Sequence, residues 1–381
     1  MQNKIPAVVM RGGTSRALFF KKDDLPADPA QWESIFLCAL GSPDTTGRQI
    51  DGLGGGVSSN SKVAVISPSD DPRYDVVYHF GQVVVDKPHV DFVGNCGNIS
   101  SAVAPFAVDE GLVSAVEPVT SVRIHQFNTD KLIVAEVEVS DGTFEESGDY
   151  AIPGINGTGS RIKLRFVDPG GTLTGALLPT GNVIDVLEDI GGFGELRCSI
   201  VDAGNPFVFV GAEELGIDAA DLSSFEDTRL ADGLEAIRAR AAVMLGFAEN
   251  DSEASILSQA VPKIAVVAAA ENYKSMGGET IDRAEMDVLI RCLSMGVLHK
   301  ALPGTAAICA AGAANIPGSV VSNLVTGDTT NLGALRFGHP SGVMEAGSTM
   351  EKKGSTFHYR EATIFRTARR IMEGNVLVPQ D

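Results

Sequence analysis

Two residues in this chain of 381 lie where a protein can change the acidity of a side chain: Lys62 and Cys96. Lys62 follows a glycine-rich segment and opens the apolar run 63–66. A lysine that enters an apolar strand loses water, and desolvation lowers the pKa of its ammonium group, so that the amine can act as a general base. Cys96 lies at the expected start of an apolar helix, where the helix dipole and unpaired N–H groups stabilise a thiolate. The two positions indicate proton-transfer chemistry.

Each of these residues also has a plainer interpretation. The segment 54–62 can be a flexible glycine turn before a strand, and Cys96 can be a small buried hydrophobe, the commoner fate of a free cysteine. A nucleotide-binding P-loop is excluded, because Lys62 follows a serine instead of a glycine and a strand follows it instead of a helix. Cys38, Cys198, Cys292 and Cys309 lie within apolar runs and are expected to be buried and inert.

Glycine-rich segments recur at 10–16, 51–62, 94–98 and 336–342. A glycine just before a helix lets backbone N–H groups approach an anion closely. Helices expected to start at 96–98 and at 304–305 would therefore make a cleft that binds carboxylates. Side chains that can add positive charge there are Arg11, Arg16, Arg48, Lys62 and His339.

Composition excludes several classes of function. The chain has 30 Lys and Arg against 49 Asp and Glu, a net charge of −19, which argues against binding nucleic acid or an anionic membrane. Five cysteines without a CxxC pair indicate reduced thiols, and with no signal-peptide pattern a cytoplasmic protein is expected. The six histidines show neither HxH nor HExxH spacing and there is no GxSxG elbow, so neither a metal site nor a serine hydrolase is expected.

Short strands and a few helices are expected in two similar halves. Amphipathic helices are predicted at 29–40, at 234–245, and from Asp282 through Val297, the last because Asp282 and Glu285 form a helix-start signature. Helices that are apolar all round, and hence enclosed, are predicted after Asn98 towards Leu112 and over 304–315. The 366–370 run is predicted to be a solvated or salt-bridged face. Strands are predicted at 7–10, 18–20, 63–66, 76–80, 82–85, 122–127, 132–139, 200–210, 362–365 and 376–378.

The parallel between the halves predicts two domains, 1–185 and 186–381, each a curved sheet around a buried helix, with a boundary between residues 181 and 194. The C-terminal strand is allowed to return to the first domain. The helix starts of the two halves would then face each other across an interdomain cleft.

The glycine-rich motifs resemble those of the PrpF / aconitate Δ-isomerase family. The matching segments run in order along almost the whole chain: MRGGTS from Met10, GSPD from Gly41, RQIDGLGG from Arg48, SK at 61–62, NCGN from Asn95, LPTGN from Leu178, LHK with GTAA across 298–307, and GHPSG from Gly338. The resemblance implies an α+β, diaminopimelate-epimerase-like fold with two pseudo-repeated domains, each a barrel-like sheet around a central helix. It also implies a cofactor-independent isomerase that moves a proton across a polycarboxylate such as 2-methylaconitate, 3-methylitaconate or 4-oxalomesaconate, with a homodimer left open.

By the same resemblance, the family's proton-transfer pair falls on Lys62 and Cys96. Lys62 as base and Cys96 as acid would shift a double bond, and the reverse assignment stays open. Epimerases of this fold use a cysteine at each central helix, whereas here the second helix begins Leu302-Pro303-Gly304. An epimerase or racemase, and a non-catalytic carboxylate-binding accessory protein, remain the alternatives. The candidate substrate contacts are Arg11, Thr14, Ser15, Ser61, Asn95, Gly97, Asn98, Gly304, Thr305, His339 and Ser341.

Overall fold

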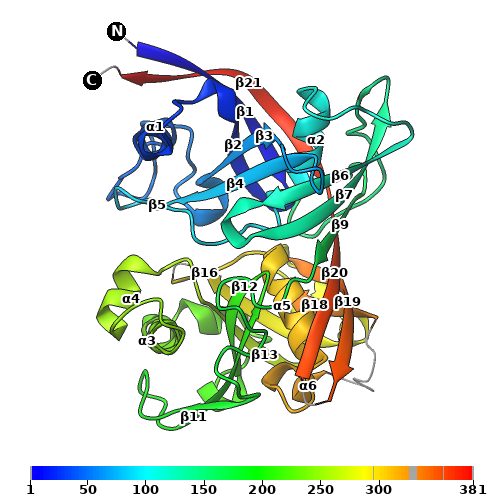
Figure 1. Ribbon diagram of the computed structural model, residues 1–381. Coiled ribbons are helices and arrows are strands. Elements are labelled where there is room, and N and C mark those ends of the chain that lie inside the picture. Colours follow the sequence, from blue (N-terminus) through cyan, green and yellow to red (C-terminus); the bar gives the residue numbers. More distant parts are fainter. Residues whose placement is uncertain (1, 295, 326–332, 355, 380–381) are drawn as a thin grey trace. The chain divides into compact units, whose positions relative to one another are not determined.

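The computed structural model describes residues 2–294, 296–325, 333–354 and 356–379 (Figure 1). Contacts between Cα atoms divide the chain into two compact units, which we call unit 1 (1–164 and 365–381) and unit 2 (165–364). The sequence placed the boundary at 185/186, whereas the chain leaves unit 1 after Leu164 and returns to it at Phe365. The first crossing falls within strand β9 (Ile162–Val167) and the second within β20 (Thr356–Arg366).

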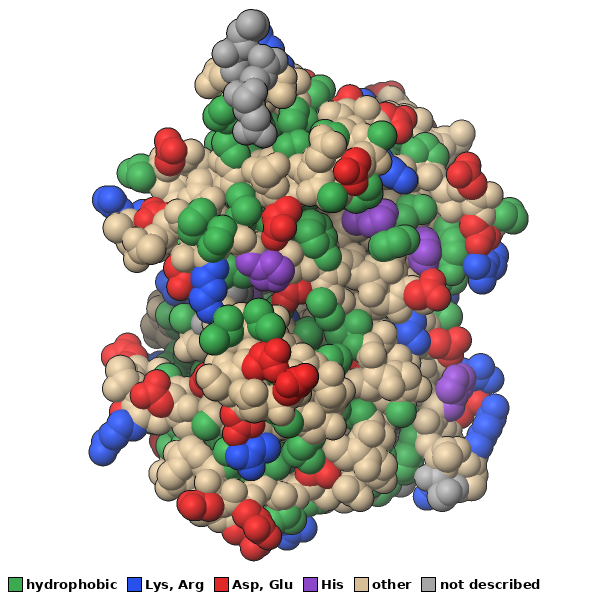
Figure 2. Space-filling model, turned by 60° about the vertical axis from the view of Figure 1, so that its left-hand side comes forward, with side chains coloured by type: hydrophobic (Ala, Val, Ile, Leu, Met, Phe, Trp, Pro, Cys, Tyr) green, Lys and Arg blue, Asp and Glu red, His purple; other side chains and the backbone are tan. Residues whose placement is uncertain are grey.

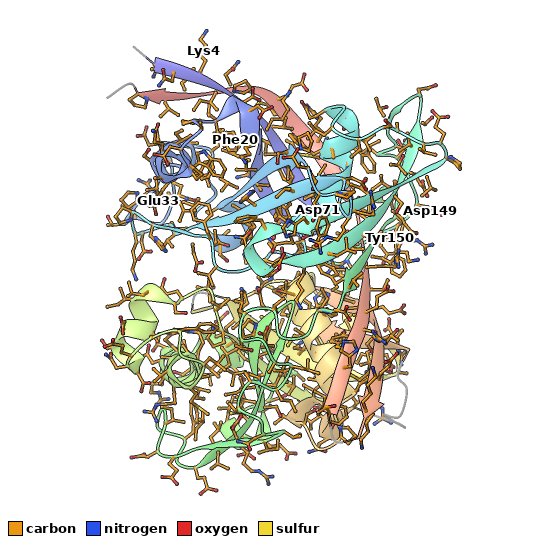
Figure 3. The ribbon with its side chains drawn as sticks, viewed as in Figure 1. Lys4, Phe20, Glu33, Asp71, Asp149 and Tyr150 are labelled. Carbon is orange, nitrogen blue, oxygen red and sulfur yellow. The ribbon has the colours of Figure 1, made fainter. Side chains whose placement is uncertain are left out.

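Unit 1 is a sheet of mostly antiparallel strands with one helix on its surface and one enclosed. Phe20 of the sheet packs against Phe36 of the surface helix, with ring centroids 5.3 Å apart (Figure 3). The N-terminal and C-terminal strands pair along nearly their whole length. Its elements are β1 (Gln2–Gly12), β2 (Ser15–Lys21), α1 (Trp32–Leu40), β3 (Lys62–Pro68), β4 (Val76–Val83), β5 (Val90–Asp91), α2 (Ser100–Asp109), β6 (Val119–Gln126), β7 (Lys131–Ser140), β8 (Thr143–Phe144) and β21 (Ala368–Pro379).

Unit 2 has its own sheet and its own enclosed helix, α5. An apolar cluster lies between the sheet and the amphipathic helix α3, and includes Leu234, Ile237 and Val266. Its elements are β10 (Asp185–Leu187), β11 (Leu196–Ala203), β12 (Asn205–Gly211), α3 (Thr228–Met244), α4 (Asp251–Leu257), β13 (Lys263–Ala269), β14 (Tyr273–Lys274), β15 (Thr280–Ile281), β16 (Val288–Ser294), β17 (Val297–Leu298), α5 (Gly304–Ala314), α6 (Val320–Leu324), β18 (Ala334–His339) and β19 (Gly342–Lys353).

The two units repeat one strand order. In unit 1 an antiparallel hairpin, β1–β2, is followed by β3 parallel to β2, and β4 then pairs antiparallel with β3. In unit 2 the strands β11, β12, β13 and β16 pair in the same way. The register repeats as well: Lys62 opens β3 opposite Ala17, and Lys263 opens β13 opposite Phe207. The predicted α+β fold of two pseudo-repeated domains is therefore confirmed.

The two enclosed helices form where their composition indicated. Every residue of α5 is buried, and in α2 the residues from Ser100 to Val108 are buried. Small and apolar side chains on all sides allow strands to pack around a helix without leaving a polar face. The pattern predicted both helices, although α2 ends at Asp109, three residues short of the expected end.

The helix predicted over 282–297 is wrong. Asp282 and Glu285 do form the capping box, but it starts only a single 3-10 turn, η7 (Arg283–Glu285). The chain then continues as strand β16, which pairs with β13 on one side and β18 on the other. A continuous apolar run matches both a buried helix and a buried strand, so periodicity alone does not separate them.

Charge is spread over the surface. Figure 2 shows acidic side chains interspersed with lysines and arginines on the face drawn, in keeping with the net charge of −19. Among the described helices, none has the length and apolar character needed to span a bilayer.

Candidate active site

Lys62 is held in the middle of the sheet of unit 1. It is the first residue of β3, with Ala17 of β2 on one side and Gln82 of β4 on the other. Its side chain is only 7% exposed. The ammonium group lies 5.4 Å from the centre of the Phe80 ring and donates a hydrogen bond to Oε1 of Gln82. The burial of this lysine agrees with the desolvation expected from its place in the sequence.

The amide of Gln82 is fixed in one orientation by the backbone around it. Its Nε2 donates to the carbonyl oxygens of Ser61 at 2.9 Å and Ser58 at 3.2 Å. Because an amide nitrogen can only donate, these two carbonyls turn Oε1 towards Lys62. Sequence reasoning did not select Gln82, whose only signal was its place at the start of a predicted strand, 82–85.

Cys96 lies in the turn that leads into α2 and is partly exposed. Its carbonyl accepts from the N–H of Ser100 at 2.9 Å and from the Ser100 hydroxyl at 3.0 Å, so the turn is continuous with the helix. Asn95 accepts from the same hydroxyl at 3.4 Å. The thiol is therefore in the first turn before an enclosed helix, where N–H groups have no partners within the helix.

The hairpin between β1 and β2 packs against this turn. Asn98, which is 1% exposed, donates from Nδ2 to the hydroxyl of Thr14 at 3.0 Å. Gly13 has a φ of 51°, and a Cβ atom at this position would overlap Oδ1 of Asn98. A glycine is required by both the backbone conformation and the close approach. Thr14, Gly97 and Asn98 thus belong to one contiguous group.

Replacing Gly13 by alanine is expected to displace the Asn98 side chain. The left-handed conformation and the overlap together should lower the free energy of unfolding by about 2–5 kcal/mol and also reduce turnover. Gly142→Ala is the matched control, because Gly142 also has a positive φ, 76°, but a Cβ atom there would have no neighbour within 4 Å. That variant should lose only about 1–2 kcal/mol in chemical denaturation. Equal losses in the two variants would contradict the packing described.

Two predicted substrate contacts are engaged in structural hydrogen bonds. Nη1 of Arg11 donates to the carbonyl of Gly13 at 3.0 Å and to the carbonyl of Thr367 at 2.9 Å, and burial lowers the pKa of its guanidinium. The hydroxyl of Ser61 lies 2.6 Å from Oε1 of Gln49, and this contact ties the 49–57 loop to β3. Ser15 is buried at the start of β2. The hydrogen bonds of Arg11 and Ser61 are thus made within the protein.

The arginines of the 366–370 run differ in their surroundings. Arg370 pairs with Glu110 at 2.6 Å and Arg369 with Glu146 at 3.5 Å, as expected for a salt-bridged face. Arg366 does not fit that prediction, because it is only 4% exposed and donates from Nε to Oδ1 of Asn98 at 3.0 Å. The prediction failed because the run is divided between two strands: Arg366 ends β20, whereas Arg369 and Arg370 lie on β21.

The remaining predicted residues lie in unit 2. Gly304 and Thr305 are buried and open α5. His339 is buried at the end of β18, and its Nδ1 accepts from the N–H of Ser341 at 3.2 Å. Because Nδ1 is the acceptor in this contact, Nε2 is the ring nitrogen placed to donate a hydrogen bond. Ser341 donates its own hydroxyl to the carbonyl of Lys300.

Two buried residues that sequence reasoning missed hold the turn of His339. The hydroxyl of Tyr273 lies 2.6 Å from the carbonyls of both His339 and Gly342. Arg291, with no exposed surface, donates from Nη1 to the carbonyl of Gly338 at 3.0 Å and lies 4.7 Å from the centre of the Tyr273 ring. Burial raises the pKa of Tyr273 to about 12 and lowers that of Arg291 to about 10.

Removing the Tyr273 hydroxyl should loosen this turn. Tyr273→Phe leaves the ring beside Arg291 but deprives two buried carbonyls of their donor, which is expected to cost about 1–3 kcal/mol of stability. Chemical denaturation measures this loss. Tyr74→Phe in unit 1, where the ring stacks on His125 at 4.5 Å, is the control and should change stability by less than about 0.5 kcal/mol. A Tyr273→Phe protein as stable as the control would show that the hydroxyl does not hold the turn.

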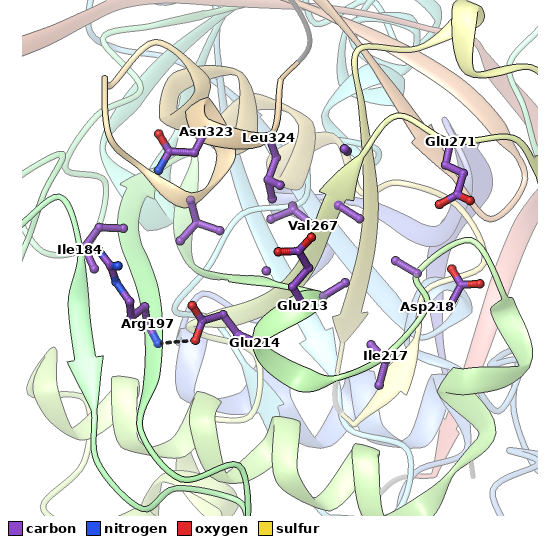
Figure 4. A pocket seen from close by; sticks show the side chains of 16 residues that line it. Ile184, Arg197, Glu213, Glu214, Ile217, Asp218, Val267, Glu271, Asn323 and Leu324 are labelled. Carbon is purple, nitrogen blue, oxygen red and sulfur yellow. Dashed lines mark hydrogen bonds between the residues drawn. The ribbon is translucent and has the colours of Figure 1, made fainter.

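A separate pocket of about 490 Å³ lies in unit 2 (Figure 4). Carboxylates of Glu213, Glu214, Asp218 and Glu271 stand around an apolar floor that includes Val267. None of the predicted site residues lines this pocket. Its acidic lining does not suit a polycarboxylate, because like charges repel.

Comparisons with known proteins agree over the full length. The PrpF protein family model matches residues 2–379. The chain is 46% identical to 3-methylitaconate isomerase of Eubacterium barkeri, over 99% of this chain and 98% of that protein. It is 41% identical to 2-methyl-aconitate isomerase of Cupriavidus necator and 37% identical to 4-oxalomesaconate tautomerase of Pseudomonas putida, in each case over 100% of this chain and 98% of the other.

Solved structures define the fold class. A crystal structure of methylitaconate-delta-isomerase superposes with a TM-score of 0.80 at 45% identity, covering 99% of this chain and 96% of that chain. A hydroxyproline epimerase from Agrobacterium vitis shares the fold, with a TM-score of 0.58 at 13% identity over 99% of this chain and 93% of that one. The fold is thus the epimerase and racemase fold, and the protein is an isomerase. The chain belongs to the PrpF family.

Proposed function

We propose that the protein catalyses a cofactor-independent 1,3-proton shift in a small unsaturated di- or tricarboxylate, with Lys62 and Cys96 as the proton-transfer pair. Substrates of the kind named for its relatives fit this chemistry: 3-methylitaconate, 2-methylaconitate and 4-oxalomesaconate. The observation that carries the proposal is the burial of Lys62, an amine almost wholly removed from solvent at the start of a central strand. Burial favours the neutral amine, which is the form that accepts a proton.

The proposed reaction moves one proton and one double bond. The Lys62 amine takes a proton from the carbon allylic to the C=C bond, and the C–H electron pair enters the conjugated system. The negative charge spreads into a carboxylate or carbonyl, where N–H groups at a helix start stabilise it. The Cys96 thiol then gives its proton to the far carbon of the allylic system. The products are the shifted alkene, a Lys62 ammonium and a Cys96 thiolate.

Proton return from the ammonium to the thiolate, directly or through solvent, restores the enzyme. The reverse assignment, in which the Cys96 thiolate is the base and the Lys62 ammonium the acid, uses the same two groups. The two side chains titrate as a pair, so macroscopic pH profiles do not assign the roles. The roles of base and acid are assigned by which variant still exchanges the allylic proton of the substrate with deuterium.

We infer that the substrate carboxylates bind to groups at the start of the enclosed helix of unit 1. These are the helix start at Cys96–Asn98 and the Thr14 hydroxyl, which lie together. Arg11, Ser15 and Ser61, which are candidate contacts by sequence, are assigned to supporting these groups.

Epimerase chemistry with a cysteine on each helix is not favoured. The cysteine of α5 is Cys309, which lies in the second turn of the helix and is completely buried. Its thiol contacts the carbonyl of Val201 at 3.3 Å, and burial raises its pKa well above the ordinary value. A buried thiol of this kind is a poor proton donor or acceptor at neutral pH.

Proton NMR of a panel of unsaturated carboxylates in D₂O tests the proposal. The panel contains 3-methylitaconate, 2-methylaconitate, 4-oxalomesaconate and, as the epimerase alternative, L-proline and trans-4-hydroxy-L-proline. We expect double-bond migration with solvent deuterium entering one of the three polycarboxylates. Epimerisation of an amino acid without any migration would overturn the proposal.

A further inference from the structure

Arg366 links the C-terminal strand to the turn that carries Cys96. Its guanidinium donates from Nε to Oδ1 of Asn98 at 3.0 Å and from Nη1 to the carbonyl of Phe365 at 3.0 Å. Asn98 in turn donates a hydrogen bond from Nδ2 to the hydroxyl of Thr14. The next residue, Thr367, accepts from the N–H of Gly13 at 2.9 Å through its carbonyl. The hairpin, the helix start and the C-terminal strand are therefore locked together around Arg366.

The charge of Arg366 acts on Cys96. Burial lowers the pKa of Arg366 to about 10, and the negative charges of Tyr150 and Cys96 oppose that change. The pKa of the Tyr78 phenol, on β4, is raised by burial. A negative charge on Cys96 raises it further. Figure 3 labels Tyr150, whose ring lies 6.3 Å from that of Phe365. The Arg366 guanidinium therefore lies near enough to Cys96 to interact with a thiolate there.

We propose that Arg366 is the positioning residue of the proton-transfer site, holding the Asn98 turn and stabilising the Cys96 thiolate that forms when the thiol gives up its proton. This rests on the proposed function. The planar guanidinium suits both tasks, because separate N–H groups bond to Asn98 and Phe365 and so fix where the positive charge lies. An ammonium group would carry the charge without that fixed geometry.

Alkylation of Cys96 tests the electrostatic part without any substrate. Iodoacetamide reacts with the thiolate, and mass spectrometry of the peptide that contains Cys96 measures the rate. In Arg366→Gln we expect the rate at pH 7 to fall about three- to tenfold, because the variant removes a positive charge that favours the thiolate. At pH 10, where thiols ionise without help, the wild-type and variant rates should agree within about twofold, which separates ionisation from a change in access.

Two further variants complete the test. Arg370→Gln removes a charge from the exposed salt-bridged part of the same segment, and it should leave the alkylation rate at pH 7 unchanged. Arg366→Lys keeps the positive charge but loses the planar guanidinium that bonds to Asn98 and Phe365. We therefore expect a near wild-type alkylation rate together with a kcat about tenfold lower. If Arg366→Gln does not fold, the kcat of Arg366→Lys still tests the positioning role.

The outcomes separate this proposal from the proposed function. A folded Arg366→Gln protein with the wild-type alkylation rate at pH 7 would overturn the electrostatic role of Arg366, and a wild-type kcat in Arg366→Lys would overturn its positioning role. Retained turnover in Cys96→Ser would instead reject the proposed function, whatever the alkylation results.

Discussion

The Lys62→Met protein is expected to fold like the wild type and to lose turnover by about 10²–10⁴-fold, the usual contribution of general acid–base catalysis. Methionine occupies a similar volume and keeps the apolar stem beside Phe80, while it removes the amine. Because the amine is the proposed base, kcat should fall while KM changes little. Initial rates on the substrate identified by NMR, together with a chemical denaturation curve, measure both effects.

Lys21→Met is the matched control for this variant. Lys21 lies on β2, in register with Ile66, at the other end of the same parallel strand pair that carries Lys62. It pairs with Glu110 at 3.1 Å and is more than a third exposed. Its replacement should leave kcat within about twofold, because Lys21 is not part of the proposed proton-transfer pair. The lost ion pair should also change the free energy of unfolding little, because exposed ion pairs contribute little to stability. If Lys62→Met turns over as fast as Lys21→Met, then Lys62 is not the base.

The second large effect is expected from Cys96→Ser. A serine hydroxyl is a far weaker acid than a thiol, so delivery of the proton should slow by about 10²–10⁴-fold although the side chain is nearly isosteric. Cys38→Ser is the control, since Cys38 is the other partly exposed cysteine and burial raises its pKa. Steady-state kinetics on both variants should show the loss in Cys96→Ser alone.

The remaining thiols do not complicate this comparison. Burial raises the pKa of Cys198 and of Cys292 to about 12, and it raises the pKa of Cys309 well above its ordinary value. At neutral pH these three groups stay protonated and enclosed. Comparable losses in Cys38→Ser and Cys96→Ser would point to a general effect of cysteine replacement and would contradict a specific role for Cys96.

Sequence patterns predicted the parts of the fold whose physics is local. Enclosed helices such as α5 are apolar on all sides, and the strand that starts at Lys62 is a run of valine, alanine and isoleucine. The 282–297 segment was misassigned because a correct capping signal, at Asp282, was followed by residues that pair with neighbouring strands instead of coiling. Sheet pairing is a long-range interaction, so it leaves little trace in a short window of sequence.

Sequence patterns indicated candidate site residues but not the residues that contact them. Lys62, Cys96 and Asn98 were selected because their types and positions indicate chemistry. Gln82 and Arg366 were missed because what they do depends on residues 20 and 268 positions away in the chain. Ser61 was selected as a contact, yet its hydroxyl is engaged with Gln49, a loop closure that no local pattern reveals.

Deuterium exchange in D₂O tests the central claim most directly, because it separates removal of the allylic proton from delivery to the far carbon. In Cys96→Ser we expect the allylic proton of the substrate to wash out faster than the isomer forms, since Lys62 still removes it. In Lys62→Met we expect neither exchange nor isomer. Wash-out that persists in Lys62→Met and disappears in Cys96→Ser would reverse the two roles, and full exchange with isomer formation in both variants would show that neither residue carries the proton.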